Sequence, residues 1–123
     1  MYGEGDLERL QDCIAENLYY YRGVCTQVYD GDSVTLDLDL GMRVWQRGIK
    51  CRLAGIDTPE LRADEREAGL AARNRLRQLI LNQEVIVHTQ KTGKYGRWLV
   101  TIYSDGININ KKLLAEGHAT EYK

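Results

Sequence analysis

Hydrophobic and polar residues follow two different periods along the 123-residue chain. Apolar side chains recur at three- and four-residue steps in residues 4–18, which predicts a helix whose apolar stripe packs on the core of this chain. The stripe consists of Leu7, Leu10, Ile14 and Leu18. From residue 21 the period changes to two, and residues 33–40 alternate most clearly. We expect that segment to be a strand with one face in the core and one face in water.

The same patterns predict the remaining elements. Strands are expected at residues 22–29, 33–40, 49–56, 85–89 and 97–103, a long helix at 64–82, and a short helix from an Asn110 cap to Gly117. Three consecutive strands exclude simple βαβ alternation. The order instead predicts an α+β fold: a five-stranded OB-fold barrel with a long helix between strands 3 and 4. We assign residues 1–20 to an N-terminal helical extension and 21–123 to the barrel domain.

Composition narrows the class of protein. With 43% hydrophobic and 28% charged residues, the sequence is typical of a globular domain. No apolar run reaches the roughly 18 residues of a membrane span. The acidic first residues do not form a secretory signal, so we expect a cytoplasmic protein. The three cysteines show no Cys-x-x-Cys spacing, which argues against a zinc site or a disulfide framework.

Charge is distributed unevenly although the net charge is only −1. Residues 43–97 carry 12 Lys and Arg against 6 Asp and Glu, whereas residues 1–42 carry 2 against 9. A basic middle segment suits a phosphate-bearing partner met at one surface. It is also typical of a solvated helix face, and the charge pattern alone favours that simpler interpretation.

The first candidate motif is Asp30-Gly31-Asp32, just before the clearest strand. It does not fit an EF-hand calcium loop, because Thr35 stands at the sixth position and Gly41 at the twelfth. Taken alone, the tripeptide is more typical of a hairpin turn.

The second motif runs from Arg52 to Glu60, with the sequence RLAGIDTPE. Pro59 holds Thr58 extended, and Asp57, Glu60 and a carbonyl oxygen are the hard donors that Ca²⁺ or Mg²⁺ prefers. The alternative is that Thr-Pro-Glu only starts a helix.

The third motif is Lys94-Tyr95-Gly96-Arg97, which lacks the spacing of a Walker phosphate loop. As a cationic loop beside a strand it could still contact phosphate, although such loops are common.

Together the three motifs resemble the staphylococcal nuclease (thermonuclease) family, which has Asp-Gly-Asp, Arg-x4-Asp-Thr-Pro-Glu and Lys-Tyr-Gly-Arg in this order and at similar separations. The resemblance covers about residues 24–119. It implies an OB-type barrel that holds one Ca²⁺ ion, with Mg²⁺ the less favoured ion. The implied protein ligands are Asp32, Asp57 and the backbone carbonyl of Thr58.

The resemblance also implies roles for the other motif residues. Glu60 would activate or orient the attacking water, Arg52 and Arg97 would hold the scissile phosphate, and Lys94 and Tyr95 would hold a neighbouring terminal phosphate. The implied reaction is calcium-dependent endonucleolytic hydrolysis of DNA and RNA, leaving 3′-phosphates, with little base preference. We expect single-stranded or flexible nucleic acid as substrate, no membrane partner, and a monomer.

General chemistry agrees with these roles. Attack on a phosphodiester builds negative charge on the equatorial oxygens, so preset cations and a base beside the water are needed. Planar guanidinium groups offer bidentate contacts that lysine does not. Two neighbouring carboxylates also require a cation, or one of them must take up a proton.

Two hypotheses of another class remain open. The chain could be a noncatalytic nuclease-like module that binds nucleic acid or protein, or an OB module that binds single strands without calcium. A decayed module should have lost some of the motif residues, and all are present here. Trp45 and Trp98 could stack on bases or pack in the core.

The family's chain continues into a further helix with active-site tyrosines, where only Tyr122 and Lys123 stand here. We therefore expect the helix at 4–18 to cover the surface that the further helix would protect.

Overall fold

The computed structural model describes the chain except for residues 1–8, 13, 16–17, 63, 93–95 and 123. The named elements, in chain order, are β1 (Tyr20–Asp30), β2 (Ser33–Gly41), β3 (Val44–Leu53), β4 (Ile56–Asp57), α2 (Arg66–Ile80), β5 (Glu84–Thr92), β6 (Trp98–Ser104), β7 (Ile107–Asn108), α3 (Ile109–Ala115) and β8 (Thr120–Glu121). No helix within the described residues has the length and apolar character needed to cross a membrane.

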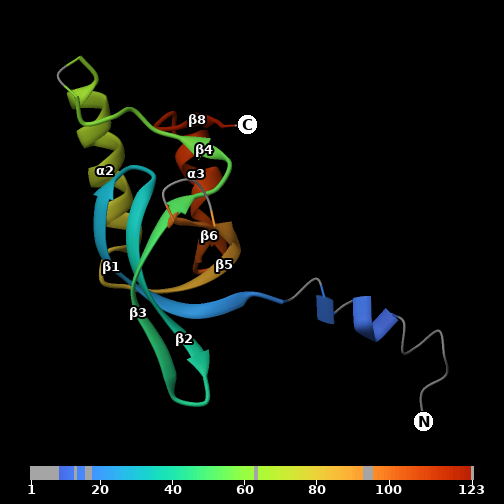
Figure 1. The fold of residues 1–123 in the computed structure, drawn as a ribbon. Helices are drawn as coiled ribbons and strands as arrows, with labels where there is room; N and C mark the ends of the chain where they lie inside the picture. Colours follow the sequence, from blue (N-terminus) through green and yellow to red (C-terminus); the bar gives the residue numbers. More distant parts are fainter. Residues whose placement is uncertain (1–8, 13, 16–17, 63, 93–95, 123) are drawn as a thin grey trace, which may run out of the picture.

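The five long strands form a closed barrel (Figure 1). Neighbouring strands follow the order β3-β2-β1-β5-β6, and β3 pairs again with β6 in parallel, which closes the sheet on itself. Helix α2 lies between the third and fourth long strands and packs on β1. The prediction of an OB-type barrel with helices is therefore confirmed, and closure leaves the long strands with few free edges.

The third predicted strand is divided in the structure. Gly55 has φ +76°, a left-handed conformation that glycine tolerates, and it turns the chain between β3 and β4. At its other end β3 begins at Val44 rather than near residue 49, because β2 and β3 continue together as a long hairpin. Gly48, with φ +70°, stands at the register shift in this hairpin.

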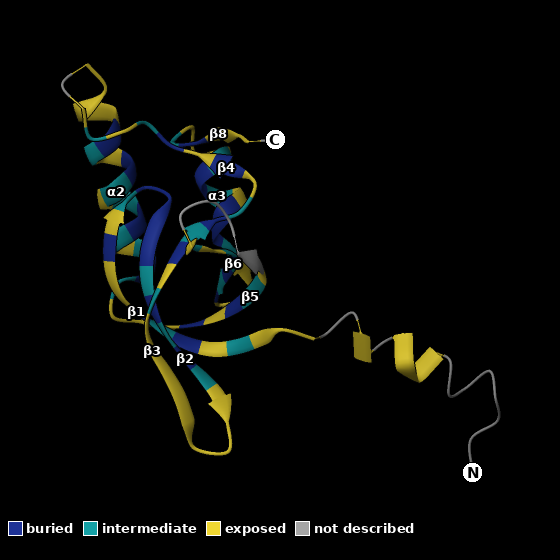
Figure 2. Ribbon diagram, in the orientation of Figure 1, coloured by how far each residue is buried: buried dark blue, intermediate teal, exposed yellow. Residues whose placement is uncertain are grey.

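The core fills the barrel with the side chains that the alternation predicts. On β2, Val34, Leu36 and Leu38 are buried, as expected for one face of a half-buried strand. Figure 2 shows that burial is concentrated in the barrel and in the faces of α2 and α3 turned toward it. On α2 the buried residues are Gly69, Ala72, Leu76 and Ile80. The spacing of apolar residues in the predicted helix places Ala68 on the same face as Ala72 and Leu76, but Ala68 is exposed.

The N-terminal segment is helical at residues 9–12 and 14–15, and Figure 1 shows it away from the barrel. Leu10, Ile14 and Leu18 are 44%, 53% and 45% exposed. The prediction that this stripe packs on the core and covers the barrel is therefore wrong for the described residues; Leu7 lies outside them.

Helix α3 begins two residues earlier than predicted. Asn108, not Asn110, is the N-cap, and its side chain accepts a hydrogen bond from the Lys111 N–H at 3.1 Å. Asn110 is instead buried inside the helix. Its Oδ1 accepts from the Ile102 N–H, and its Nδ2 donates to the carbonyls of Ala54 and Val100. This side chain joins α3 to β6 and to the turn that precedes β4.

Candidate functional site

The first two motifs meet at one end of the barrel. The Asp30–Asp32 turn connects β1 to β2, and the Thr58 segment follows β4. A β-carbon on Gly31 would lie only 2.8 Å from Thr58 Oγ1, so glycine is required for this close approach. The Thr58 N–H donates to Asp32 Oδ2 at 3.2 Å, and the Asp32 N–H donates to Asp30 Oδ1 at 3.0 Å. The two loops therefore hold Asp32, which is 7% exposed, in one orientation.

Arg52 joins the two predicted metal-binding carboxylates. Its Nη2 lies 3.4 Å from Asp32 Oδ2 and 3.2 Å from Asp57 Oδ1. Its Nη1 donates to the Ile56 carbonyl at 3.1 Å and to the Leu53 carbonyl at 3.4 Å. The guanidinium carbon lies 4.7 Å from the centre of the Tyr122 ring, within cation–π range. The Arg52 head group is thus fixed by several contacts at the site.

Arg97 reaches the same place from the start of β6. Its Nη1 donates to Ser33 Oγ at 2.9 Å, and the Ser33 hydroxyl donates to Asp32 Oδ1 at 3.3 Å. One hydroxyl therefore links the second arginine to the buried carboxylate. Among the described residues no carboxylate lies within 4.0 Å of the Arg97 side-chain nitrogens, which leaves its charge available to an anion.

Glu60 is positioned by α2 and by the loop before it. A β-carbon on Gly69 would lie 2.6 Å from the Glu60 carbonyl oxygen, so the helix touches the backbone of this segment. The Glu60 N–H donates to Glu65 Oε2 at 3.0 Å. The Glu60 carboxylate pairs with Arg62 and is well exposed, with 58% of its side chain accessible to solvent. It is an accessible carboxylate on a fixed backbone.

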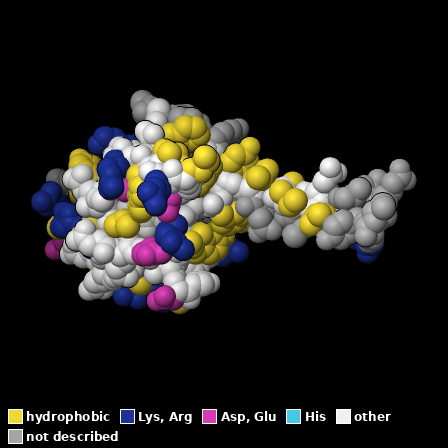
Figure 3. All heavy atoms as spheres, turned by 90° about the horizontal axis from the view of Figure 1, so that it is seen from below, with side chains coloured by type: hydrophobic (Ala, Val, Ile, Leu, Met, Phe, Trp, Pro, Cys, Tyr) yellow, Lys and Arg dark blue, Asp and Glu magenta, His cyan; other side chains and the backbone are white. Residues whose placement is uncertain are grey.

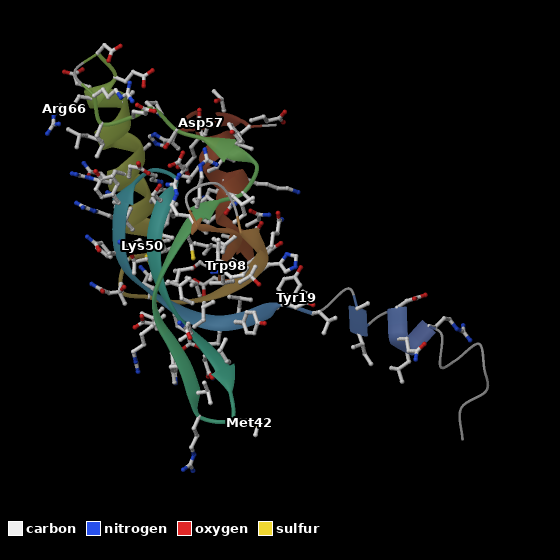
Figure 4. The ribbon with its side chains drawn as sticks, viewed as in Figure 1. Tyr19, Met42, Lys50, Asp57, Arg66 and Trp98 are labelled. Carbon is white, nitrogen blue, oxygen red and sulfur yellow. The ribbon has the colours of Figure 1, made fainter. Side chains whose placement is uncertain are left out.

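These side chains surround one hollow of about 440 Å³. It is lined by Tyr29, Asp30, Asp32, Ser33, Arg52, Asp57, Thr58, Glu60, Leu61, Arg62 and Arg97. All six predicted residues that the structure describes therefore lie around it; Figure 4 labels Asp57 at this end of the barrel. Lys94 and Tyr95 lie outside the described residues.

Burial raises the pKa of the Asp32 carboxyl, and the neighbouring Asp30 adds to the rise, while Arg52 and the Thr58 N–H oppose it. A buried carboxylate of this kind is stabilised by additional positive charge. The buried Thr58 Oγ1 makes no hydrogen bond within the described structure.

These oxygen atoms fit a hard cation. Asp32, Asp57 and the Thr58 carbonyl oxygen supply the donors that Ca²⁺ prefers. Within the described residues no group of three or more His, Cys, Asp or Glu side chains gathers in a metal-binding cluster.

Several residues of this site were not found from the sequence. Ser33 bridges Asp32 and Arg97. Glu65 accepts a hydrogen bond from the Glu60 N–H, and the Tyr122 ring lies against Arg52. No spacing rule shows such side-chain contacts. The sequence alone could have pointed to Gly69. A glycine in the middle of a helix lowers helix propensity, and it usually stands there because another segment packs closely against it. Here the reason is the Glu60 backbone.

Comparison with known proteins agrees with this geometry. The family model described as staphylococcal nuclease homologue matches residues 50–123, which include Arg52, Asp57, Glu60 and Arg97. A micrococcal nuclease of Shigella flexneri is 31% identical over 112 residues, covering 84% of this chain and 59% of that protein. An uncharacterized endonuclease of Haemophilus influenzae is 29% identical over 97 residues, covering 79% of this chain and 50% of that protein.

A probable staphylococcal-like nuclease of Oryza sativa subsp. japonica, named CAN3, is 32% identical over 80 residues, covering 65% of this chain and 20% of that protein. The chain thus spans at most about 60% of the length of these curated relatives. The family match covers more than half of the chain, and the motif residues within it lie around one hollow. The chain belongs to the staphylococcal nuclease homologue family.

Proposed function

We propose that this chain is a calcium-dependent endonuclease that hydrolyses phosphodiester bonds of DNA and RNA with little sequence preference and leaves 3′-phosphates. One observation carries the proposal: two arginines and an accessible carboxylate, Arg52, Arg97 and Glu60, line the same hollow as the buried Asp32. Membership of a nuclease family supports the same reaction class.

The residues suit hydrolysis of a phosphodiester. Glu60 accepts a proton from a water molecule as the water oxygen bonds to phosphorus. The P–O5′ bond then breaks, the departing 5′ oxygen takes a proton from a solvent water molecule, and the phosphate stays on the 3′ side. Arg52 and Arg97 stabilise the charge that develops on the phosphate oxygens. Because Arg52 is fixed by carbonyls and carboxylates, its orientation needs little rearrangement during the reaction.

We propose Asp32, Asp57 and the Thr58 carbonyl as the protein ligands of Ca²⁺. The ion would supply a fixed positive charge beside the phosphate. Ca²⁺ suits this set better than Mg²⁺, because Ca²⁺ tolerates irregular coordination whereas Mg²⁺ demands near-ideal octahedral geometry. Isothermal titration of the protein with CaCl₂ and with MgCl₂, repeated on Asp32→Asn, tests the ligands without measuring activity. The proposal requires Ca²⁺ binding that the substitution removes.

The activity itself is tested on supercoiled plasmid, heat-denatured DNA and single-stranded RNA, each with CaCl₂ and with EGTA. We expect cleavage with calcium only, with 5′-hydroxyl ends that polynucleotide kinase phosphorylates without prior phosphatase treatment. Glu60→Gln should lower turnover at least a hundredfold, which is within the range for a positioned general base. Glu67→Gln, an exposed acid in the first turn of α2, is the control and should keep the wild-type rate.

Two results would contradict the proposal. If Glu60→Gln cleaves as fast as the control, Glu60 is not the base. If the wild-type protein binds these nucleic acids without cutting them in calcium, the chain is instead a noncatalytic module.

A further inference from the structure

The hollow at the candidate site is the first of three that follow one another along the barrel surface. A second hollow of about 290 Å³ shares Tyr29, Asp30, Ser33 and Arg97 with it. A third, of about 560 Å³, shares Lys50, Cys51 and Arg97 with the second. Neighbouring hollows thus have lining residues in common, and we call the three together the basic–aromatic groove. Arg97 lines all three hollows, Lys50 lines the second and the third, and Trp98 lines the third.

Lys50 lines the middle hollow of this groove together with Arg97. It stands two residues before Arg52 on β3, so both side chains lie on the same side of the strand, about 6.6 Å apart along it. In the described structure no carboxylate lies within 4.0 Å of the Lys50 amine. Asp30, the acid of the middle hollow, accepts a hydrogen bond from the Asp32 N–H. Lys50 is therefore placed to meet a phosphate next to one held at the site.

Trp98 lines the third hollow of the groove. It is the first residue of β6 and stands two and four residues before the buried Val100 and Ile102, so its side chain lies on the same side of the strand as theirs. Even so, Trp98 is 43% exposed, and its ring stacks on no aromatic or cationic side chain among the described residues. The surrounding lining is largely apolar and includes Tyr21, Leu38 and Ile49. Such a ring can stack on a nucleic-acid base.

Trp45, the other tryptophan, differs from Trp98 in its position and in the contact that its ring makes. It lies on the exposed hairpin, and the Arg47 guanidinium covers its ring at 5.3 Å from the centre. The Arg47 charge is also taken up by Asp37, at 3.0 Å. Trp45 does not line the groove. The structure thus separates two tryptophans that sequence alone treats alike.

We propose that the basic–aromatic groove binds single-stranded nucleic acid on one side of the scissile phosphate, with Lys50 contacting a phosphate and Trp98 stacking on a base. Figure 4 shows Lys50 and Trp98 in the same part of the barrel, below the end that carries Asp57. Figure 3 shows hydrophobic, basic and acidic side chains intermixed on the face of the barrel seen from below. A cation followed by an exposed aromatic ring is the pattern of single-strand binding, and continuity with the site favours the substrate strand over a protein partner. The inference rests on the proposed function for the identity of that strand.

The experiment measures binding without turnover, in EGTA. The Trp45→Phe variant leaves Trp98 as the sole tryptophan. Its fluorescence is followed during titration with an oligothymidylate octamer, with a dimer, and with an abasic octamer of the same charge. We expect saturable quenching by the octamer, little quenching by the dimer, and little by the abasic octamer because it has no base to stack.

Affinity for a fluorescein-labelled octamer is then compared between variants by anisotropy. Trp98→Ala should weaken binding about 5- to 100-fold, the range of one base–aromatic stack. Trp45→Ala is its control and should stay within about twofold of the wild type. Lys50→Gln should lower the slope of log affinity against log salt by about 0.7, the value for one phosphate contact on a single strand. Arg43→Gln, at the hairpin tip outside the groove, should leave the slope unchanged.

The outcomes separate this inference from the proposed function. Equal binding by Trp98→Ala and Trp45→Ala, or equal quenching by normal and abasic octamers, would overturn the groove even if the protein cleaves DNA. Length-dependent quenching of Trp98 in a protein that never cleaves would uphold the groove and overturn the nuclease. Circular dichroism melts of all variants guard against misfolding, and the quenching readout does not depend on a substitution at Trp98.

Discussion

Gly69 lies directly against the backbone of Glu60, so that a β-carbon at position 69 would come within 2.6 Å of the Glu60 carbonyl oxygen. The same carbon would lie 3.0 Å from the Pro59 carbonyl oxygen. Both neighbours are backbone atoms, which cannot rotate aside as the end of a side chain can. Helix α2 therefore determines where the Glu60 segment lies. No side chain of the helix itself lines the hollow at the candidate site.

Gly69→Ala should move the Glu60 segment. In an ordinary helix this substitution stabilises by about 1 kcal/mol through propensity. Here we expect a lower melting temperature and at least tenfold lower nuclease activity, because the clash displaces the carboxylate. The measurements are a thermal melt and plasmid cleavage. Ala68→Gly, on the exposed side of the same turn, should lose about 1 kcal/mol of stability and keep its activity. A more stable and fully active Gly69→Ala protein would show that the segment is free to shift.

Arg52→Lys should remove most of the activity while keeping the positive charge. A lysine cannot contact the Ile56 carbonyl and both carboxylates at once with a planar head group. We expect a loss of roughly 3–4 kcal/mol of transition-state stabilisation, by analogy with a missing oxyanion donor. Steady-state cleavage of a labelled oligonucleotide measures it, with Arg66→Lys, at the exposed start of α2, as the control. A loss no larger than that of the control would mean that charge alone is enough at this position.

Asn110→Ala should destabilise the barrel by about 3 kcal/mol. Asn110 is 4% exposed, and its removal leaves the buried Ile102 N–H without its partner and the Ala54 carbonyl without a donor. Urea denaturation measures the change in the free energy of unfolding. Asn108→Ala removes only the cap of α3 and should cost about 1 kcal/mol. Equal losses for the two variants would show that Asn110 contributes no more than a surface cap.

The Arg75–Glu116 pair, which joins α2 to the end of α3, predicts a pH dependence. The Arg75 guanidinium donates to both Glu116 oxygens, at 2.7 and 2.9 Å, and lowers the pKa of that carboxyl from 4.5 to about 2. A pKa lowered in the folded state stabilises above the unfolded value. The contribution is therefore fully present above pH 4.5 and is lost as the pH falls toward about 2.

Melting temperatures of the wild type and of Glu116→Gln, measured across that range, check this dependence. The difference between them should be largest above pH 4.5 and should shrink toward pH 2. In an Arg75→Gln background the difference should be much smaller at every pH. A difference that stays constant with pH would mean that the ion pair does not affect folding.

The sequence patterns predicted the barrel because its strands are regular. Val34, Leu36 and Leu38 alternate with polar residues, and burial follows that alternation. The motif residues were also predicted, since Asp32, Arg52 and Glu60 lie in short segments with distinctive spacing. The turn at Gly55 was missed because its neighbours are apolar and continue the strand pattern.

Two further differences between the sequence predictions and the structure are caused by tertiary contacts. Asn110 is a typical capping residue, but its amide satisfies backbone groups on β6 and before β4 that no local pattern shows. Leu10 and Ile14 form a regular stripe, yet periodicity shows only that a helix is amphipathic and not what covers it. The hollows lined by Arg97, Lys50 and Trp98 were not predicted either, because their walls come from strands that meet only in the closed barrel.

The parallel pairing of β3 with β6 has a consequence during synthesis. Arg52 pairs with Leu99, and Cys51 with Trp98, across a separation of nearly fifty residues. Contacts so distant in sequence form late, because a long loop must first close. A nascent chain still attached to a ribosome cannot bring Arg52 and Arg97 to the same hollow before β6 has emerged. Incomplete translation products would thus lack the assembled candidate site.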